Sequence, residues 1–219
     1  MGLLDFIQQK RNVQTSGEPG MLSDALLTLE DVIAPSGIEI NSRSINISGT
    51  YARTFFAVSY PRYLNDGWLE PILNVEKELD VSIFIHPINT ADTLKKFQKK
   101  VAEVQSQINV RAEQGMVRDP QLEAAYRNLE ELRDKLQQAE EKLFDAGLYV
   151  TLYGEDEASL NKTESEIKGI LDARLIYLKP ALFQQEQGIK SVLPFMQDEL
   201  MIHSKFNSSP LSSFFPFTS

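Results

Sequence analysis

The sequence predicts an α+β protein with a ferredoxin-like antiparallel sheet and a long antiparallel helical hairpin inserted between the two halves of that sheet. Two observations lead to this fold class. A strand–helix–strand pattern occurs twice along the chain, once before and once after residues 92–146. Residues 92–146 themselves carry two consecutive helical patterns separated by a short break. We expect this arm to project from a small core and to contact partners.

The first half of the sheet lies before residue 92. Residues 53–60 (RTFFAVSY) are aromatic and β-branched, which predicts a central strand. Residues 68–78 carry apolar side chains at helical spacing, and we expect Trp68 of this short helix to lie in the core. Residues 81–85 predict a second buried strand. Short alternating runs predict an added strand pair, with apolar residues at Ile38, Ile40, Ile45 and Ile47.

The hairpin carries a heptad pattern on each of its helices. On the first helix the apolar positions are Leu94, Phe97, Val101, Val104 and Ile108. On the second they are Leu122, Ala125, Leu129, Leu132, Leu136, Ala139 and Leu143. Gly115 interrupts the pattern, and Asp119 and Pro120 restart it as N-cap and first helical residue. The short break makes the helices antiparallel, with their apolar seams facing each other.

The second half of the sheet follows the hairpin. Residues 148–153 alternate as a half-buried strand does. Residues 158–171 predict a helix with Asp156 as its N-cap, and residues 175–178 predict the closing strand. Residues 181–190 have the pattern of one further helix.

We divide the chain into three parts. Residues 1–23 are predicted to be a flexible tail, and a helical pattern covers residues 21–33. Residues 24–180 form the ferredoxin-like domain with the hairpin at residues 92–146. Residues 181–219 are expected to be a helix and a linker that leads into a further domain. In that linker we expect a short helix capped by Ser209, and exposed aromatic side chains at Phe206, Phe214, Phe215 and Phe217.

Composition limits the function classes. The net charge of −9 disfavours sequence-independent binding of nucleic acid. The chain has no cysteine, which excludes disulfides and cysteine-ligated zinc. No apolar run approaches the ~20 residues that span a bilayer. We therefore expect a cytoplasmic protein, or a peripheral one at the cytoplasmic face of a membrane.

Motifs for chemistry are missing from the sequence. It has neither G-x-x-x-x-G-K-[ST] nor G-x-G-x-x-G, so no phosphate-binding loop is predicted. The two histidines, His86 and His203, are far apart in sequence; we interpret the first as a strand-end residue and the second as part of a weakly structured tail. Residues 155–157 are acidic, and a capped turn is favoured over a metal site. The lysines of residues 95–100 are favoured as a solvated face over a phosphate or lipid site. We predict no catalytic, cofactor-binding or metal-binding residue.

Several segments together resemble one family. Its N-terminal strands are similar to residues 53–61 (RTFFAVSYP), Trp68-Leu69 and residues 81–88 (VSIFIHPI). Its strand after the hairpin is similar to Leu143-Phe144 with residues 148–153 (LYVTLY). Its later blocks resemble Gln184-Gln185, residues 191–194 (SVLP) and residues 213–219 (SFFPFTS). The family is that of the large conjugative type IV secretion ATPases, and the resemblance covers residues 29–219.

This resemblance implies an N-terminal docking domain. Its expected partners are inner-membrane subunits of the secretion machine and neighbouring protomers of a homo-oligomer, without direct contact to nucleic acid. In the family a motor domain follows, and ATP and Mg²⁺ are expected only there, so this chain is expected not to hydrolyse nucleotide. The alternatives are a free-standing adaptor with a coiled-coil arm, unrelated to secretion, and an enzyme of unknown type.

Overall fold

The computed structural model describes residues 34–215. The chain divides into two compact units, Met1–Pro35 and Ser36–Ser219. The predicted tail over residues 1–23, the helical pattern over residues 21–33 and Phe217 lie outside the described residues. Everything that follows concerns the second unit.

The second unit is an α+β structure, as predicted. Its strands are β1 (Ile38–Ile40), β2 (Ile45–Ile47), β3 (Thr50–Ser59), β4 (Leu79–Pro87), β5 (Leu143–Gly154), β6 (Tyr177–Pro180) and β7 (Ser204–Asn207). Its helices are α3 (Glu70–Leu73), α4 (Thr90–Glu113), α5 (Pro120–Gln137), α6 (Glu157–Asp172), α7 (Gln185–Val192) and α8 (Ser208–Ser212). Within residues 34–215, no helix has both the length and the apolar character needed to cross a bilayer.

The strands form one seven-stranded antiparallel sheet with the long strand β5 at its centre. One edge of β5 pairs with β4 along nine residues. Its other edge pairs with β3 over one part and with β7 over another. Strand β3 in turn pairs with β2 and β6. Strands that are far apart in the sequence, such as β4 and β7, therefore lie on either side of β5.

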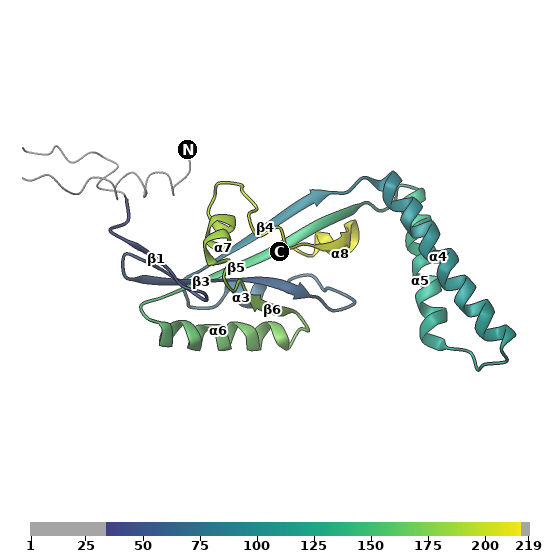
Figure 1. Ribbon diagram of the computed structural model, residues 1–219, viewed down its shortest axis with the longest axis horizontal. Helices are drawn as coiled ribbons and strands as arrows, with labels where there is room; N and C mark the ends of the chain where they lie inside the picture. Colours follow the sequence, from purple (N-terminus) through teal and green to yellow (C-terminus); the bar gives the residue numbers. More distant parts are fainter. Residues whose placement is uncertain (1–33, 216–219) are drawn as a thin grey trace, which may run out of the picture. The chain divides into compact units, whose positions relative to one another are not determined.

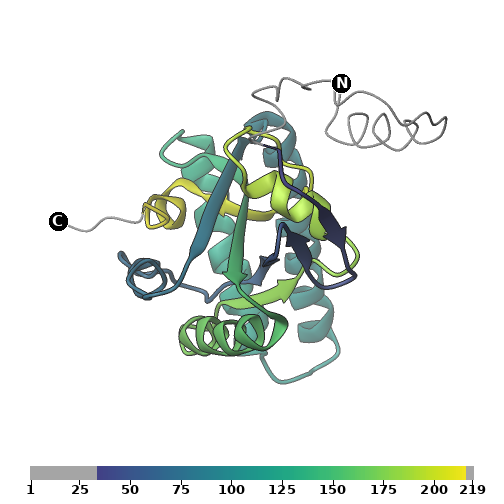
Figure 2. The ribbon, with the colours of Figure 1, turned by 90° about the vertical axis from the view of Figure 1, so that its left-hand side faces the viewer.

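Both faces of the sheet are covered, and α6 and α7 lie on opposite sides of it (Figures 1 and 2). Successive side chains of β5 point alternately to the two faces of the sheet. Leu148, Val150 and Leu152 pack in a core with Leu160 and Ile167 of α6. Tyr149 packs on the other side with Ala181 and Leu200. Ile72 of α3 belongs to the same core as the α6 residues, and α7 and the segment after it cover the other face.

Two helices, α4 and α5, lie between β4 and β5 in the chain and contact each other. We call α4, α5 and their connecting loop, residues 90–137, the arm (Figure 1). Its buried side chains Val101, Val104 and Leu136 belong to none of the sheet's core clusters, so the arm has an apolar interior of its own. Asp119 caps α5 as predicted, accepting hydrogen bonds from the backbone N–H groups of Gln121 and Leu122.

The predicted ends of two elements were wrong. The heptad pattern runs on to Leu143, yet α5 ends at Gln137 and Leu143 is the first residue of β5. The Ile88 N–H donates to the Leu143 carbonyl at 3.0 Å, so strand pairing takes over from helix there. The helix expected over residues 68–78 is limited to α3, although Trp68 is buried in the core as expected.

The exposure expected for the C-terminal aromatic residues was wrong for two of them. Phe206 and Phe214 are buried and stack edge-on with each other at 4.9 Å between ring centroids. Tyr60 and Trp68 complete this aromatic group. Phe206 lies in β7, which pairs with β5, so the segment expected to be a linker also supplies a strand of the sheet. The short helix expected at Ser209 is α8, and its N-cap is Asn207.

Candidate functional site

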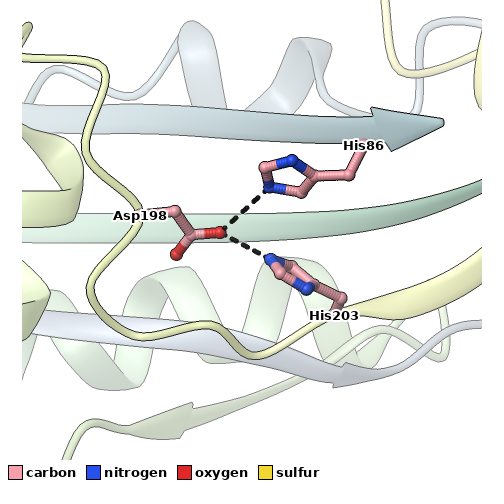
Figure 3. A group of neighbouring side chains, drawn as sticks. All are labelled: His86, Asp198 and His203. Carbon is pink, nitrogen blue, oxygen red and sulfur yellow. Dashed lines mark hydrogen bonds and ion pairs between the residues drawn. The ribbon is translucent and has the colours of Figure 1, made fainter.

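Three side chains from two distant parts of the chain meet on the α7 face of the sheet. They are His86, Asp198 and His203, which we call the His–Asp–His cluster (Figure 3). Among the described residues this is the group whose side chains could hold a metal ion: one ligand atom from each lies within 4.8 Å of the others. The sequence analysis predicted no such site.

His86 is positioned by the sheet. It lies near the end of β4, opposite Asp145 of β5, on the same face as Phe84 two residues earlier. The rings of Phe84 and His86 stack with their centroids 6.3 Å apart. The regular strand therefore determines where this imidazole points, and the interpretation of His86 as a strand-end residue was correct in that respect.

Asp198 and His203 lie in the segment between α7 and β7. Ser191 of α7 holds the middle of this segment, because its hydroxyl accepts hydrogen bonds from the Glu199 and Leu200 N–H groups at 2.9 and 3.1 Å. Pairing of β7 with β5 fixes its C-terminal end. Both imidazoles then point at one carboxylate oxygen, with His203 Nε2 at 2.5 Å and His86 Nε2 at 3.4 Å from Asp198 Oδ2 (Figure 3).

The other carboxylate oxygen is occupied by the protein. Tyr149 donates its hydroxyl hydrogen to Asp198 Oδ1 at 2.8 Å, and the Met201 N–H donates to the same atom at 3.0 Å. Burial, followed by the nearby Asp198 carboxylate, raises the pKa of Tyr149, so this hydroxyl stays protonated and remains a donor. The carboxylate is thus held in one orientation, with Oδ2 directed at the two rings.

The charge of Asp198 is stabilised in place. Burial acts to raise its pKa, but the contacts with His203, Tyr149 and the Met201 N–H outweigh burial and hold that pKa below its usual value. The carboxylate is therefore ionised at neutral pH. An ionised carboxylate between two imidazoles can act as a hydrogen-bond acceptor or as a metal ligand.

Gly147 of β5 makes room for the His203 ring. A Cβ at this position would lie 3.0 Å from His203 Cδ2 and 2.7 Å from the Tyr149 hydroxyl oxygen. Any larger residue would therefore displace the ring, the hydroxyl or both. Strand β5 thus supplies both the space for one imidazole and the group that orients the carboxylate.

Sequence reasoning missed this cluster because its members come from two distant parts of the chain. The spacing of Asp198 and His203 is a weak signal by itself, and His86 is 112 residues away from Asp198. Only the placement of β4 and β7 on the two edges of β5 brings the three together. Of the other sequence candidates, Asp156 caps α6 as predicted, and the structure adds a capping box between Asp156 and Ser159.

The tip of the arm is a second candidate site, of a different kind. Met116 and Val117, in the loop between α4 and α5, are exposed, the latter to 88%. They line a pocket together with Ile108 and Leu122. Exposed apolar side chains at the end of a projecting element are typical of contact surfaces. The lysines expected on the outer face of α4, among them Lys95 and Lys99, are also exposed.

Comparison of the sequence with protein-family models and with curated proteins finds no match. The functional argument for this chain therefore depends on the placement of its own residues.

Proposed function

We propose that this chain is the N-terminal docking and assembly domain of a large conjugative or type IV secretion ATPase. It acts through protein–protein contacts, at the cytoplasmic face of the inner membrane, and does not itself hydrolyse nucleotide. Its partners are inner-membrane subunits of the machine and, in the full-length protein, neighbouring protomers. The observation that carries the proposal is the arm, which leaves the sheet between two paired strands and ends in exposed apolar residues.

The arrangement of the sheet supports the family resemblance. Strands β6, β3, β5 and β4 are neighbours in that order, with α3 between β3 and β4 in sequence and α6 between β5 and β6. We infer from this order a ferredoxin-like β-α-β-β-α-β unit, with the arm at the connection between its halves. Such cores serve many functions, so the fold by itself does not choose among them.

The arm supports docking because its interior and its tip have different roles. Val104 of α4 and Leu136 of α5 are buried between the two helices. The apolar heptad positions are therefore used for packing inside the hairpin. Met116 and Val117 at the tip are left outside that packing. A rigid pair of helices thus presents a small apolar end, with Arg111 and Arg118 beside it.

The test is binding to inner-membrane subunits of a type IV secretion machine from the same host, purified in detergent. We expect the full chain to bind, and the double variant Met116→Asp/Val117→Asp to bind about tenfold or more weakly, since one lost apolar anchor is worth more than ~1.4 kcal/mol. Gln98→Asp is the matched control, because it adds a charge to an exposed position on α4 away from the tip.

Three results would contradict the proposal in whole or in part. Equal binding by the tip variant and the control would remove the arm tip from the interface. Failure of the full chain to bind these subunits, together with arm-dependent binding to some other protein, would favour the free-standing adaptor. Hydrolysis of ATP by the purified chain would contradict the non-enzymatic part of the proposal.

A further inference from the structure

We propose that His86, Asp198 and His203 bind one divalent transition-metal ion, with Zn²⁺ as the ion best suited to these ligands. This inference goes beyond the docking function and does not depend on it. Two imidazoles and one carboxylate are a ligand set that suits zinc and its neighbours, whereas Mg²⁺ and Ca²⁺ prefer oxygen ligands alone. Three protein ligands leave at least one coordination position open to water.

One distance between donor atoms matches what a metal requires, and a second is shorter. Ligands at about 2.0–2.1 Å from a tetrahedral ion lie roughly 3.3 Å from each other. His86 Nε2 and Asp198 Oδ2 are 3.4 Å apart, which fits. His203 Nε2 and the same oxygen are 2.5 Å apart, so an ion would separate this pair by about 0.8 Å relative to the hydrogen-bonded arrangement. Both imidazoles already direct the same ring atom, Nε2, to a common point (Figure 3).

The surroundings of Asp198 are those of an oriented metal ligand. Its Oδ1 accepts hydrogen bonds from the Tyr149 hydroxyl and the Met201 N–H, which leaves Oδ2 for the ion. Hydrogen bonds of this kind, made to the atoms of a ligand that do not touch the metal, hold ligands in position in metal sites. The Tyr149 hydroxyl also accepts a hydrogen bond from the Ile202 N–H at 3.2 Å, so the orienting group is itself fixed.

His86 is the most solvent-exposed member of the cluster. The side chain of Asp198 is 7% exposed and that of His203 is 16% exposed, whereas that of His86 is 49% exposed. An ion can therefore enter past His86, and water can complete its coordination. The ion would tie the segment between α7 and β7 to β4, which adds a link across the face of the sheet.

The test is titration of the tag-free chain with Zn²⁺ in a non-coordinating buffer, followed by calorimetry, with Co²⁺ absorption as a second readout. We expect one ion per chain, a visible Co²⁺ spectrum that Zn²⁺ abolishes, and affinity lowered about tenfold or more in His86→Gln, since loss of even an orienting group costs 10–100-fold. Because the chain has only two histidines and no cysteine, no other imidazole or thiol can take over.

The variants separate loss of the site from loss of the fold. His86 is half-exposed and its contact with Asp198 is long, so His86→Gln keeps an N–H donor there and leaves the fold intact. Asp145→Asn is the matched control: this carboxylate lies opposite His86 on β5 but pairs with Lys205 at 2.7 Å. We expect the control to bind as the parent does. Equal Zn²⁺ affinity in the parent and His86→Gln, or no stoichiometric binding to the parent, would show that the cluster is a hydrogen-bonded group only.

Discussion

Glu164 of α6 is a buried carboxylate that pairs with three basic side chains. Its carboxylate oxygens lie 2.6 Å from Arg53 Nη1, 2.6 Å from Lys168 Nζ and 2.9 Å from Arg43 Nη2. The side chain of Arg53 is only 2% exposed, so its guanidinium bonds to Glu164, Asn161 and the Arg43 carbonyl in place of water. The group fixes α6 to β3 through a charge pair that water cannot replace.

We predict that Glu164→Gln lowers the free energy of unfolding by about 3–5 kcal/mol, because it leaves the Arg53 charge buried without its counter-ion. Denaturant unfolding followed by fluorescence measures this. Glu166→Gln is the control, since Glu166 is exposed on the same helix and its replacement should change stability by less than ~0.5 kcal/mol. Equal effects of the two substitutions would mean that the ion group contributes nothing specific.

The same residue predicts an acid dependence. Burial acts to raise the pKa of Glu164, but hydrogen bonds from Lys168, Arg43 and Arg53 outweigh it and hold that pKa below the usual glutamate value. A carboxyl whose pKa is lower in the folded state stabilises the fold fully above its unfolded pKa of about 4.3, and that stabilisation is lost as pH falls through the folded pKa. The free energy of unfolding should therefore decrease less steeply with acidification in Glu164→Gln than in the parent. An unchanged slope would contradict the assignment.

Residue-level reasoning from the sequence succeeded where the interaction is local. The N-caps Asp119 and Asp156 were predicted because a cap acts within three residues of itself. The Arg53–Glu164 pair and the His–Asp–His cluster were not predicted, since each joins segments more than a hundred residues apart. A sequence read without the strand order contains no information on which distant charges meet.

At the scale of elements, α7 is seated unusually close to β3. A Cβ on Gly188 would lie 2.6 Å from Thr54 Cβ. Thr54 cannot move aside easily, because Gln185 bonds to its backbone N–H at 2.8 Å and its hydroxyl bonds to Thr151 at 2.7 Å. Two features therefore hold α7 close to β3: the buried side-chain amide of Gln185, and the lack of a side chain at Gly188.

We predict opposite effects for two glycine-to-alanine substitutions in helices. Gly188→Ala should cost about 1–3 kcal/mol by overpacking against Thr54. Gly169→Ala on α6, where nothing lies within 4 Å, should raise stability by about 0.5–1 kcal/mol through helix propensity. Thermal or denaturant unfolding of the two variants measures both. A stabilising Gly188→Ala would show that α7 can shift away from β3.

The arm offers a local test of the predicted cap. Asp119 accepts two backbone hydrogen bonds at the start of α5 and lies 3.6 Å from Arg111 of α4. Asp119→Ala should destabilise α5 by about 1 kcal/mol. Amide hydrogen exchange should quicken in residues 120–124 and stay unchanged in β5. Exchange that quickens across the sheet as well would mean that arm and sheet unfold as one.

Element boundaries were the weakest part of the sequence prediction, and the reason is physical. Leu136, Ala139 and Leu143 continue a helical spacing, but Leu143 is also an apolar residue that β5 buries beside β4 and β7. Tertiary pairing decides between these outcomes, and intrinsic pattern does not. The same holds for Phe206, whose burial depends on β7 pairing with β5.

At the scale of the whole unit, the arm and the sheet are two packed structures joined at one place. Strands β4 and β5 stay paired up to Pro87 and Phe144, so the long insertion leaves their register undisturbed. The sheet keeps its own clusters on both faces, and the arm keeps its own interior between α4 and α5. This separation is what allows an appendage to carry contacts without cost to the core.

We therefore predict that the arm can be removed without unfolding the sheet. Replacing residues 89–142 by an Asn-Gly turn joins Ile88 to Leu143, which are already hydrogen-bonded at 3.0 Å, as a two-residue hairpin. The single tryptophan, Trp68, lies in the sheet's core and reports on that core alone. Its fluorescence midpoint in denaturant should match that of the parent, while the helical circular dichroism signal falls.

In the parent protein, we expect the arm and the sheet to unfold in separate transitions. Among residues 34–215, α4 and α5 contribute most of the helix, so they dominate the dichroism signal of that part of the chain. If the arm unfolds by itself, the dichroism transition precedes the Trp68 transition and the two do not coincide. Leu152→Ala, which opens a cavity under α6, is the control: it should move the Trp68 midpoint through a loss of about 2–5 kcal/mol. Two results together would contradict this separation: coincident transitions in the parent, and a much lower Trp68 midpoint after arm removal. They would show that the sheet needs the arm for its stability, so the arm could not be a peripheral contact element alone.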